Sequence, residues 1–201
     1  MDFAELVRTR TMTRAFDPTP IDRELLESLV DAATRSPSAG KAQGFDLVVF
    51  EGSDTARFWD VTLPSSERAN FAWPRLLDAP VIALVCADPH AYLARYSEPD
   101  KARTGLGDST NSWPAPYWTI DASFATMTLL YAAHDAGLGA LFFAVARGAD
   151  EIRRTCNIPD HVEMLGALAL GWPHAQSGVR KGRSAPRARR AASSVMRFNS
   201  W

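Results

Sequence analysis

The sequence predicts a mixed β-sheet flanked by helices, of the α/β or α+β class. Helical and strand-like segments alternate loosely along the 201 residues. Residues 81–87 form an unbroken apolar run, which is typical of a central strand that is buried on both faces. Residues 120–136 form a helix that is apolar almost all the way round, as in a buried or interface helix. The length suits one domain over residues 1–201.

The first half of the chain supplies helices and one strand. Apolar residues at helical spacing, beginning with Phe3, predict a short first helix. Asp22 is a suitable N-cap for a second helix, which Pro37 ends. Residues 45–50 lie between glycines and predict a strand, and residues 54–62 predict a short helix.

The second half begins with the buried strand 81–87. Residues 97–118 are rich in Gly, Ser, Pro and Asp, which is typical of a lid or binding loop, although disorder is the alternative. After the long helix we expect a strand over 139–145, a helix over 149–156 and a last core strand over 163–170.

Charge is distributed unevenly, although the net charge is only −1. Residues 178–201 carry seven Lys and Arg and no acid, so the rest of the chain has 15 basic and 23 acidic groups, a net charge of −8. The acidic body argues against nucleic-acid binding, so a basic arm that binds nucleic acid is the weakest of the alternatives for this tail. Apolar side chains such as Phe198 and Trp201 favour a tail that lies across another surface.

Membrane, secretory and metal signals are absent from the sequence. No segment approaches the roughly 18 unbroken apolar residues of a membrane span, and the acidic start lacks the apolar run of a signal peptide. The two cysteines, Cys86 and Cys156, and the four histidines have no disulfide or metal-binding spacing. We therefore expect a cytoplasmic protein that uses no metal, no membrane and no nucleic acid.

Two segments carry the chemistry of a ligand site. The first, Arg10-Thr-Met-Thr-Arg14, places two guanidiniums and two hydroxyls within five residues, and such groups bind phosphate. The second, Pro37-Ser-Ala-Gly-Lys-Ala-Gln43, is a loop of small residues that lets backbone groups approach a flat ligand. A basic helix end and an ordinary turn are the respective alternatives. Together the segments suggest two halves of a nucleotide-like cofactor site.

Nearly the whole chain resembles the FMN-dependent nitroreductase family. Besides these two segments, the resemblance rests on Leu76-Leu-Asp-Ala-Pro80, Ala133-His-Asp-Ala-Gly-Leu-Gly139, Ala169-Leu-Gly-Trp-Pro173 and Lys181-Gly-Arg183. The small-residue loop and the Trp-Pro-Ala-Pro-Tyr-Trp segment at 113–118 resemble actinobacterial-type members. The family implies an α+β fold, an intertwined homodimer and FMN bound between the two subunits. The C-terminal extension, residues 178–201, would wrap the partner subunit.

The resemblance also implies which residues contact the cofactor. One subunit would hold the FMN phosphate with Arg10, Thr11, Met12, Arg14, Lys181 and Arg183, and would lie against the flavin with Arg75, Phe143, Ala144 and Val145. Its partner would supply Pro37, Ser38, Ala39, Gly40, Lys41 and Gln43. The alternatives are solvent exposure for Lys41 and Arg75, and a plain core strand for residues 143–145.

The flavin would perform the chemistry, so no catalytic side chain is predicted. Trp113, Tyr117 and Trp118 are the predicted substrate wall, because aromatic faces stack on flat molecules; core packing is the alternative. The expected reaction is ping-pong hydride transfer from NAD(P)H, as co-substrate, to a nitroaromatic, quinone or similar small acceptor. The alternatives are a flavin-sequestering protein without turnover and a specialised member with another donor or reaction.

Overall fold

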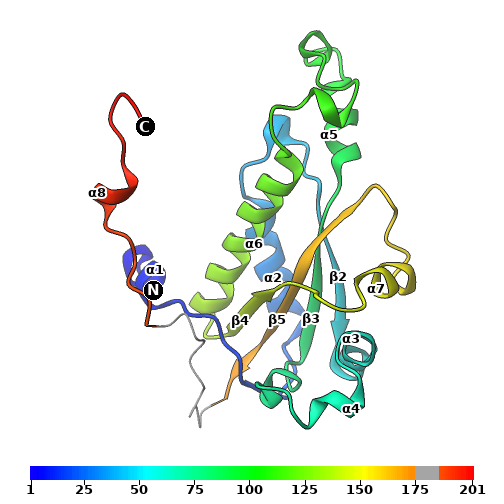
Figure 1. The fold of residues 1–201 in the computed structure, drawn as a ribbon, viewed down its shortest axis with the longest axis vertical. Helices are drawn as coiled ribbons and strands as arrows, with labels where there is room; N and C mark the ends of the chain where they lie inside the picture. Colours follow the sequence, from blue (N-terminus) through cyan, green and yellow to red (C-terminus); the bar gives the residue numbers. More distant parts are fainter. Residues whose placement is uncertain (175–185) are drawn as a thin grey trace.

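A five-stranded sheet lies between two layers of helices (Figure 1), in a computed structural model that describes residues 1–174 and 186–201. Strand β5 (Glu163–Pro173) pairs with β3 (Val81–Ala87) on one edge and with β1 (Phe16–Asp17) and β4 (Gly139–Phe143) on the other; β3 also pairs with β2 (Phe45–Glu51).

The α+β prediction is confirmed, and the pairings between these named strands are all antiparallel. Within the described residues, the parallel part of the predicted mixed sheet is one isolated bridge between Met12 and Ala140.

Strand β3 divides the core into two halves. All seven of its residues are buried, as the apolar run predicts. Because successive strand side chains point to opposite faces, Ile82 packs with residues of α3 (Thr55–Thr62) and α7 (Ala149–Thr155). Ala83 packs on the other face, with residues of α2 (Arg23–Thr34) and α6 (Tyr117–Asp135).

Carboxylates cap the two N-terminal helices. Asp2 precedes α1 (Phe3–Thr9) and accepts a hydrogen bond from the backbone N–H of Glu5. Asp22 precedes α2 and accepts bonds from the N–H groups of Glu24 and Leu25, as predicted. A carboxylate at this position satisfies free N–H groups and interacts favourably with the helix dipole.

Helix α6 begins at Tyr117, three residues earlier than the apolar pattern suggests, and runs beside α2. Its buried face includes Asp121, Thr126 and Leu129, whereas Phe124 keeps 48% of its surface exposed. A half-exposed phenylalanine on an otherwise apolar helix leaves one side of α6 available for further packing.

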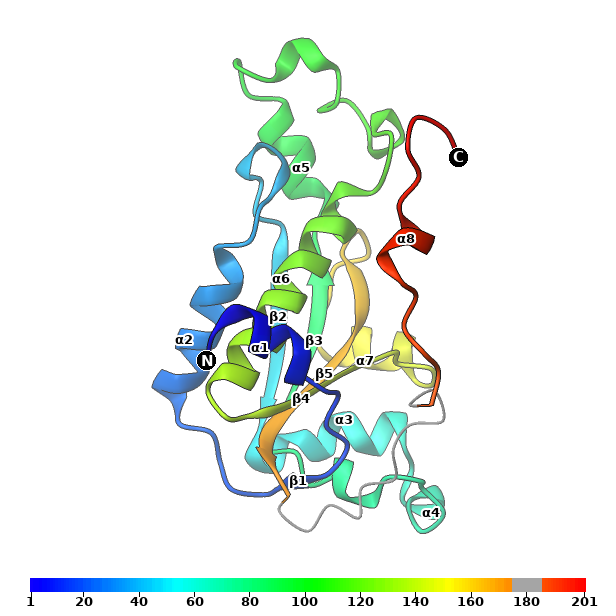
Figure 2. The ribbon, with the colours of Figure 1, turned by 90° about the vertical axis from the view of Figure 1, so that its left-hand side faces the viewer.

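Helix α5 (Pro89–Tyr96) is an element that the sequence analysis did not predict. Its N-cap is Asp88, whose carboxylate accepts from the N–H of His90, and Pro89 stands at the first helical position. The irregular segment that follows contains short 3₁₀ helices at Ala102–Thr104 and Thr110–Ser112. Figure 2 shows this segment and α5 at one end of the molecule, with α3 and α4 (Ser65–Arg68) at the other.

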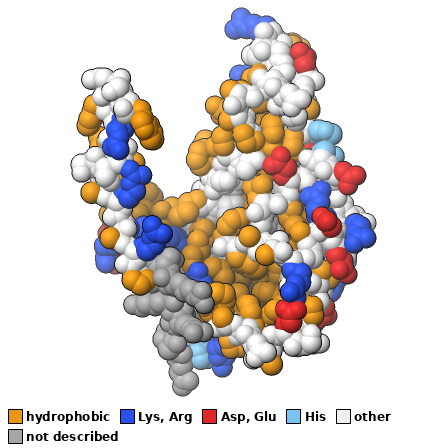
Figure 3. Space-filling view, in the orientation of Figure 1, with side chains coloured by type: hydrophobic (Ala, Val, Ile, Leu, Met, Phe, Trp, Pro, Cys, Tyr) orange, Lys and Arg blue, Asp and Glu red, His pale blue; other side chains and the backbone are white. Residues whose placement is uncertain are grey.

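The end of the chain stands apart from the body. Residues 186–201 contain the single turn α8 (Ala192–Val195). Figure 3 shows them as an arm across open space from a face rich in hydrophobic side chains. The apolar side chains of Val195, Met196, Phe198 and Trp201 are all exposed on this arm. In the part of the chain that the structure covers, every helix is too short or too polar to cross a membrane.

Candidate functional site

The arginine segment, residues 10–14, lies directly beside β4. The N–H of Thr13 donates to the carbonyl oxygen of Ala140 at 2.9 Å, and Met12 forms the parallel bridge with the same residue. Gly139 allows this approach, because a Cβ there would lie 2.6 Å from the Thr13 side chain. The sheet therefore holds the backbone between the two arginines.

Both guanidiniums lack an acidic partner among the residues described. The Nη1 atom of Arg10 is buried and makes no hydrogen bond. Arg14 donates to the Met12 carbonyl at 3.3 Å, and its guanidinium carbon lies 5.6 Å from the Trp73 ring centre. A buried donor without an acceptor is costly, and more so when it is charged. An anionic group from outside the described chain would remove that cost.

Arg75 differs from these two arginines. Its Nη1 lies 3.1 Å from the Asp78 carboxylate, in an exposed ion pair. Its side chain does not line the pocket beside Arg14. This placement favours the surface alternative for Arg75.

An aromatic pocket of about 430 Å³ opens beside Arg14, between α3 and the end of β4. Its walls include Trp59 and Phe143, whose ring planes lie within 2° of parallel and whose centroids are 6.1 Å apart. Ala144 and Val145 also line it. The structure thus brings together Arg14 and the predicted residues 143–145, which lie far apart in the sequence.

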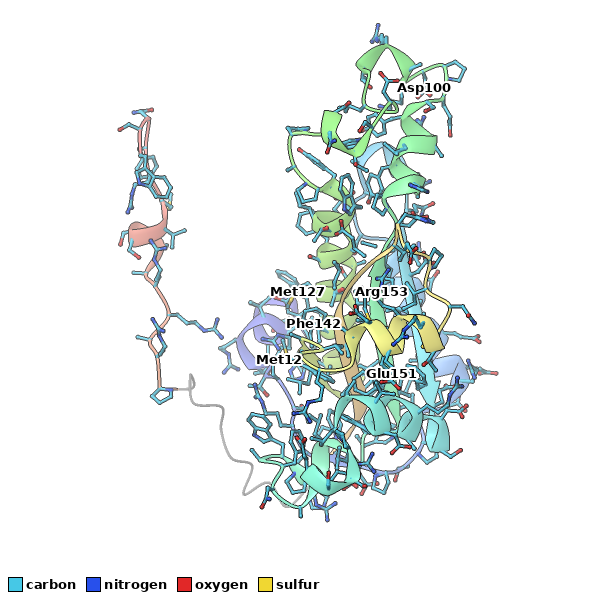
Figure 4. All side chains as sticks on the ribbon, turned by 45° about the vertical axis from the view of Figure 1, so that its right-hand side comes forward. Met12, Asp100, Met127, Phe142, Glu151 and Arg153 are labelled. Carbon is cyan, nitrogen blue, oxygen red and sulfur yellow. The ribbon has the colours of Figure 1, made fainter. Side chains whose placement is uncertain are left out.

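Three half-buried apolar side chains extend this surface toward α6. Met12, Met127 and Phe142 come from the arginine segment, α6 and β4, and Figure 4 shows them close to one another. Gly166 makes room for Phe142, because a Cβ there would lie 2.8 Å from its ring. The arginines therefore border an apolar surface, which suits a ligand with a charged end and a flat apolar end.

The small-residue loop, residues 37–43, lies at the opposite end of the molecule. It follows α2 and reaches the α5 end in Figure 2, whereas the aromatic pocket lies toward α3. The loop borders a small cavity of about 60 Å³, together with Tyr92 and Asp121. This cavity and the aromatic pocket beside Arg14 share no lining residue.

The predicted substrate wall divides into buried and exposed residues. The indole N–H groups of Trp113 and Trp118 donate to the Leu106 carbonyl and to Glu163, each at 2.8 Å. Both rings are buried in a cluster around Tyr92 and do not line the aromatic pocket. This placement favours core packing. Tyr117 remains 37% exposed.

Some candidate residues give less information. Lys181 and Arg183, predicted to complete the phosphate site, lie outside the described residues. Thr11 is exposed beside the two arginines.

Burial raises the pKa of Cys86 to about 11, so its thiol remains protonated at neutral pH.

Asp88, His90 and His161 form a surface cluster of residue types that bind metals. The two imidazole rings stack in parallel, with centroids 3.8 Å apart and planes within 6°. Nitrogen lone pairs lie in the ring planes, and parallel planes do not converge on one ion. At least one ring would have to rotate before both could bind a metal.

The residues of the aromatic pocket that sequence reasoning missed include two tryptophans. Trp59 and Trp73 line it, and the buried Nε1 atom of each has no hydrogen-bond partner among the described residues. The signal was the density of aromatic residues around positions 58–73. Nothing in that spacing shows that these side chains face Arg14.

Comparisons of the sequence and of the structure with known proteins all point to one family. The model of the nitroreductase family matches residues 7–172. A protein of Methanothermobacter thermautotrophicus, provisionally named NADH dehydrogenase/NAD(P)H nitroreductase, is 28% identical over 183 residues, which cover 90% of this chain and 82% of that protein.

Solved structures show the same fold at lower identity. A nitroreductase-like protein from Streptococcus mutans has a TM-score of 0.76 at 17% identity and covers 99% of this chain and 98% of its own. A structure described as an oxidoreductase containing FMN has a TM-score of 0.65 at 22% identity, over 87% of this chain and 78% of that chain.

Proposed function

Because the chain belongs to the nitroreductase family of oxidoreductases, we propose that it binds FMN and reduces a small acceptor with NAD(P)H. The acceptor class we propose is a nitroaromatic compound or a quinone, reduced in ping-pong order. The provisional name of the relative from Methanothermobacter thermautotrophicus supports NAD(P)H as the donor, and the FMN-containing structural neighbour supports the cofactor. We also place the chain among actinobacterial-type members, on the basis of its loop and its 113–118 segment.

The observation that carries the proposal is the pair of uncompensated arginines beside an aromatic pocket. The buried, unbonded Nη1 of Arg10 fits a phosphate oxygen, and Arg14 lines the pocket itself. Doubly charged phosphate esters are held best by several fork-shaped donors. The half-buried surface of Met12 and Phe142 fits a flat ring system. The residues present therefore fit FMN.

A homodimer is part of this proposal. The small-residue loop of one copy would close the site on the arginine segment of the other. The exposed Phe124 on α6, Phe3 on α1 and the apolar arm at 195–201 offer surface for that association. Two copies that pack through these faces would bury apolar area that a single chain leaves in water.

Each group in the site would have a limited role. When bound, FMN would supply the hydride-transfer chemistry between NAD(P)H and the acceptor. The arginines would hold the phosphate, and a backbone N–H at Ala144 or Val145 would donate to the redox-active edge of the ring. The aromatic walls of the pocket would exclude water and align a flat acceptor.

Since both cysteines are free thiols, we assign the enzyme to a reducing compartment, the cytoplasm.

The first test is spectroscopic. The purified protein, reconstituted with FMN, should show flavin absorbance that NADPH or NADH bleaches anaerobically and that a nitroarene or quinone restores. Protein that takes up no FMN contradicts the proposal. Bound flavin that no donor reduces would instead select flavin sequestration, and bleaching by a deazaflavin donor alone would select a specialised member of the family.

The second test addresses the residues. Replacing both Arg10 and Arg14 with alanine should release FMN, because it removes the two cations that would hold the phosphate. The matched control is Arg8→Ala, which removes an exposed arginine on α1 whose acidic partner among the described residues is Glu5, at 3.8 Å. Stoichiometric FMN in the double variant would refute the phosphate assignment.

A further inference from the structure

The small-residue loop has an unusual backbone that needs support. Gly40, Lys41 and Gln43 all have positive φ angles, of 60°, 60° and 56°. For Lys41 and Gln43 this left-handed conformation costs energy, because each carries a Cβ. Strained residues of this kind persist only where their surroundings hold them, and they concentrate at functional sites.

A buried carboxylate on α6 holds the start of the loop. The Oδ2 atom of Asp121 accepts the backbone N–H of Ala39 at 2.7 Å and the hydroxyl of Tyr92 at 2.8 Å. Asp121 is 7% exposed and Tyr92 is 1% exposed. Hydrogen bonds to a charged acceptor in a buried place are the stronger kind. The Asp121 carboxylate thus joins the backbone of Ala39 to both α6 and α5.

Helix α5 holds the middle of the loop. The Nε atom of Arg95 donates to the carbonyl oxygen of Gly40 at 2.8 Å. Two bonds of 2.8 Å to the Asp100 carboxylate fix the guanidinium itself. Gly40 is pressed against the helix, because a Cβ there would lie 2.8 Å from the Tyr96 ring.

The loop closes on itself through Ser38. The hydroxyl oxygen of Ser38 accepts the N–H of Gln43 at 2.9 Å, and its carbonyl oxygen accepts the N–H of Lys41 at 2.8 Å. The side chains of Lys41 and Gln43 are exposed and bond to nothing among the described residues. The loop backbone is therefore fixed by α5, α6 and Ser38, while the exposed side chains of Lys41 and Gln43 remain available to a ligand.

We propose that Asp121 is a positioning residue which, with Tyr92 and Arg95, holds the loop in the conformation that receives FMN from the other subunit. The inference rests on the proposed function and identifies the contacts that fix the part of the FMN site formed by the loop. Asp121 touches neither the arginine segment nor the aromatic pocket. Its effect on FMN would therefore pass entirely through residues 38–43. A loop already held in place loses less entropy on binding than one that must be ordered.

Backbone hydrogen exchange in the protein without FMN tests the mechanical part. In Asp121→Ala, the amides of Lys41 and Gln43 should exchange about tenfold faster, although neither is bonded to Asp121 itself. The matched control is Thr126→Ala, since Thr126 is a buried polar residue on α6 whose hydroxyl donates to the carbonyl of Ala122 on its own helix. Loop exchange that is unchanged in Asp121→Ala, or equally fast in both variants, overturns the inference.

Titration with FMN tests the functional part. Asp121→Ala should bind FMN about tenfold more weakly, and Thr126→Ala should bind it as the wild type does. Asp121→Asn should fall between, because its amide oxygen can still accept the N–H of Ala39. Equal FMN affinity in Asp121→Ala and wild type overturns this inference alone. A wild-type chain that binds no FMN overturns the proposed function together with it.

Discussion

Replacing Gly139 with alanine would disturb the contact that holds the arginine segment against β4. The added Cβ would lie 2.6 Å from both Oγ1 and Cγ2 of Thr13 and 2.7 Å from its Cβ. Ordinary contacts between such atoms are about 3.5–4.0 Å. The arginine segment would have to move away from β4 by about 1 Å, and both arginines would move with it.

The cost follows from the contacts that are lost. Displacement breaks the hydrogen bond from Thr13 to Ala140, worth about 1 kcal/mol, and overpacking adds about 1–3 kcal/mol. The expected loss of stability is therefore about 2–4 kcal/mol, or roughly 4–16 °C in Tm for a chain of this size. A misplacement of about 1 Å should also weaken FMN binding by at least about tenfold.

Thermal unfolding and FMN titration measure both effects, and a second substitution supplies the control. Thr13→Gly removes all three atoms that the new Cβ would meet. In the Gly139→Ala background it should recover most of the FMN affinity, although Thr13→Gly alone is destabilising through its backbone freedom. Unchanged affinity and Tm in Gly139→Ala would refute the packing argument, and so would a double variant no better than the single one.

Three further predictions concern other parts of the fold. Hydrogen bonds from Arg95 hold the pKa of Asp100 below its ordinary value, so this pair stabilises the protein above about pH 4 and loses that effect as pH falls through the lowered pKa. The Tm difference between wild type and Asp100→Asn should therefore be constant from pH 7 to 5 and vanish in stronger acid. A Tm difference that grew in acid would contradict the predicted direction. Trp118→Phe should cost about 1–2 kcal/mol in stability, because it removes the N–H that Glu163 accepts, with KM for a nitroarene unchanged; a large rise in KM would restore the substrate-wall assignment. Cys86 should resist alkylation at pH 8 in the native state and react once urea unfolds the chain, since burial raises its pKa to about 11; rapid native labelling would contradict this.

Local patterns predicted most of the elements correctly. The apolar run at 81–87 gave β3, and Asp22 marked the start of α2, because capping and burial leave direct traces in the sequence. Helix α5 escaped prediction although Asp88 and Pro89 are both helix-start signals, since the helix has only eight residues and a weak apolar stripe.

Long-range geometry accounts for what the sequence could not show. Arg14 meets Phe143 through the pairing of β4 with β5 and the contact of the arginine segment with Ala140, and no spacing rule encodes that. The same holds for Asp121, whose bond to Ala39 spans 82 residues. Trp118 carries an aromatic face suitable for either role, and only its buried partners indicate packing.

Complementation between two defective chains tests the central claim most directly. One chain carries Arg10→Ala and Arg14→Ala, and the other carries Gly40→Val, which places a branched side chain at a φ of 60° and against Tyr96. Each variant alone should bind no FMN. If one subunit supplies the arginines and its partner supplies the loop, a mixed dimer purified through two different tags has one intact site and should bind one FMN per dimer. Mixed dimers that bind none would contradict the shared site.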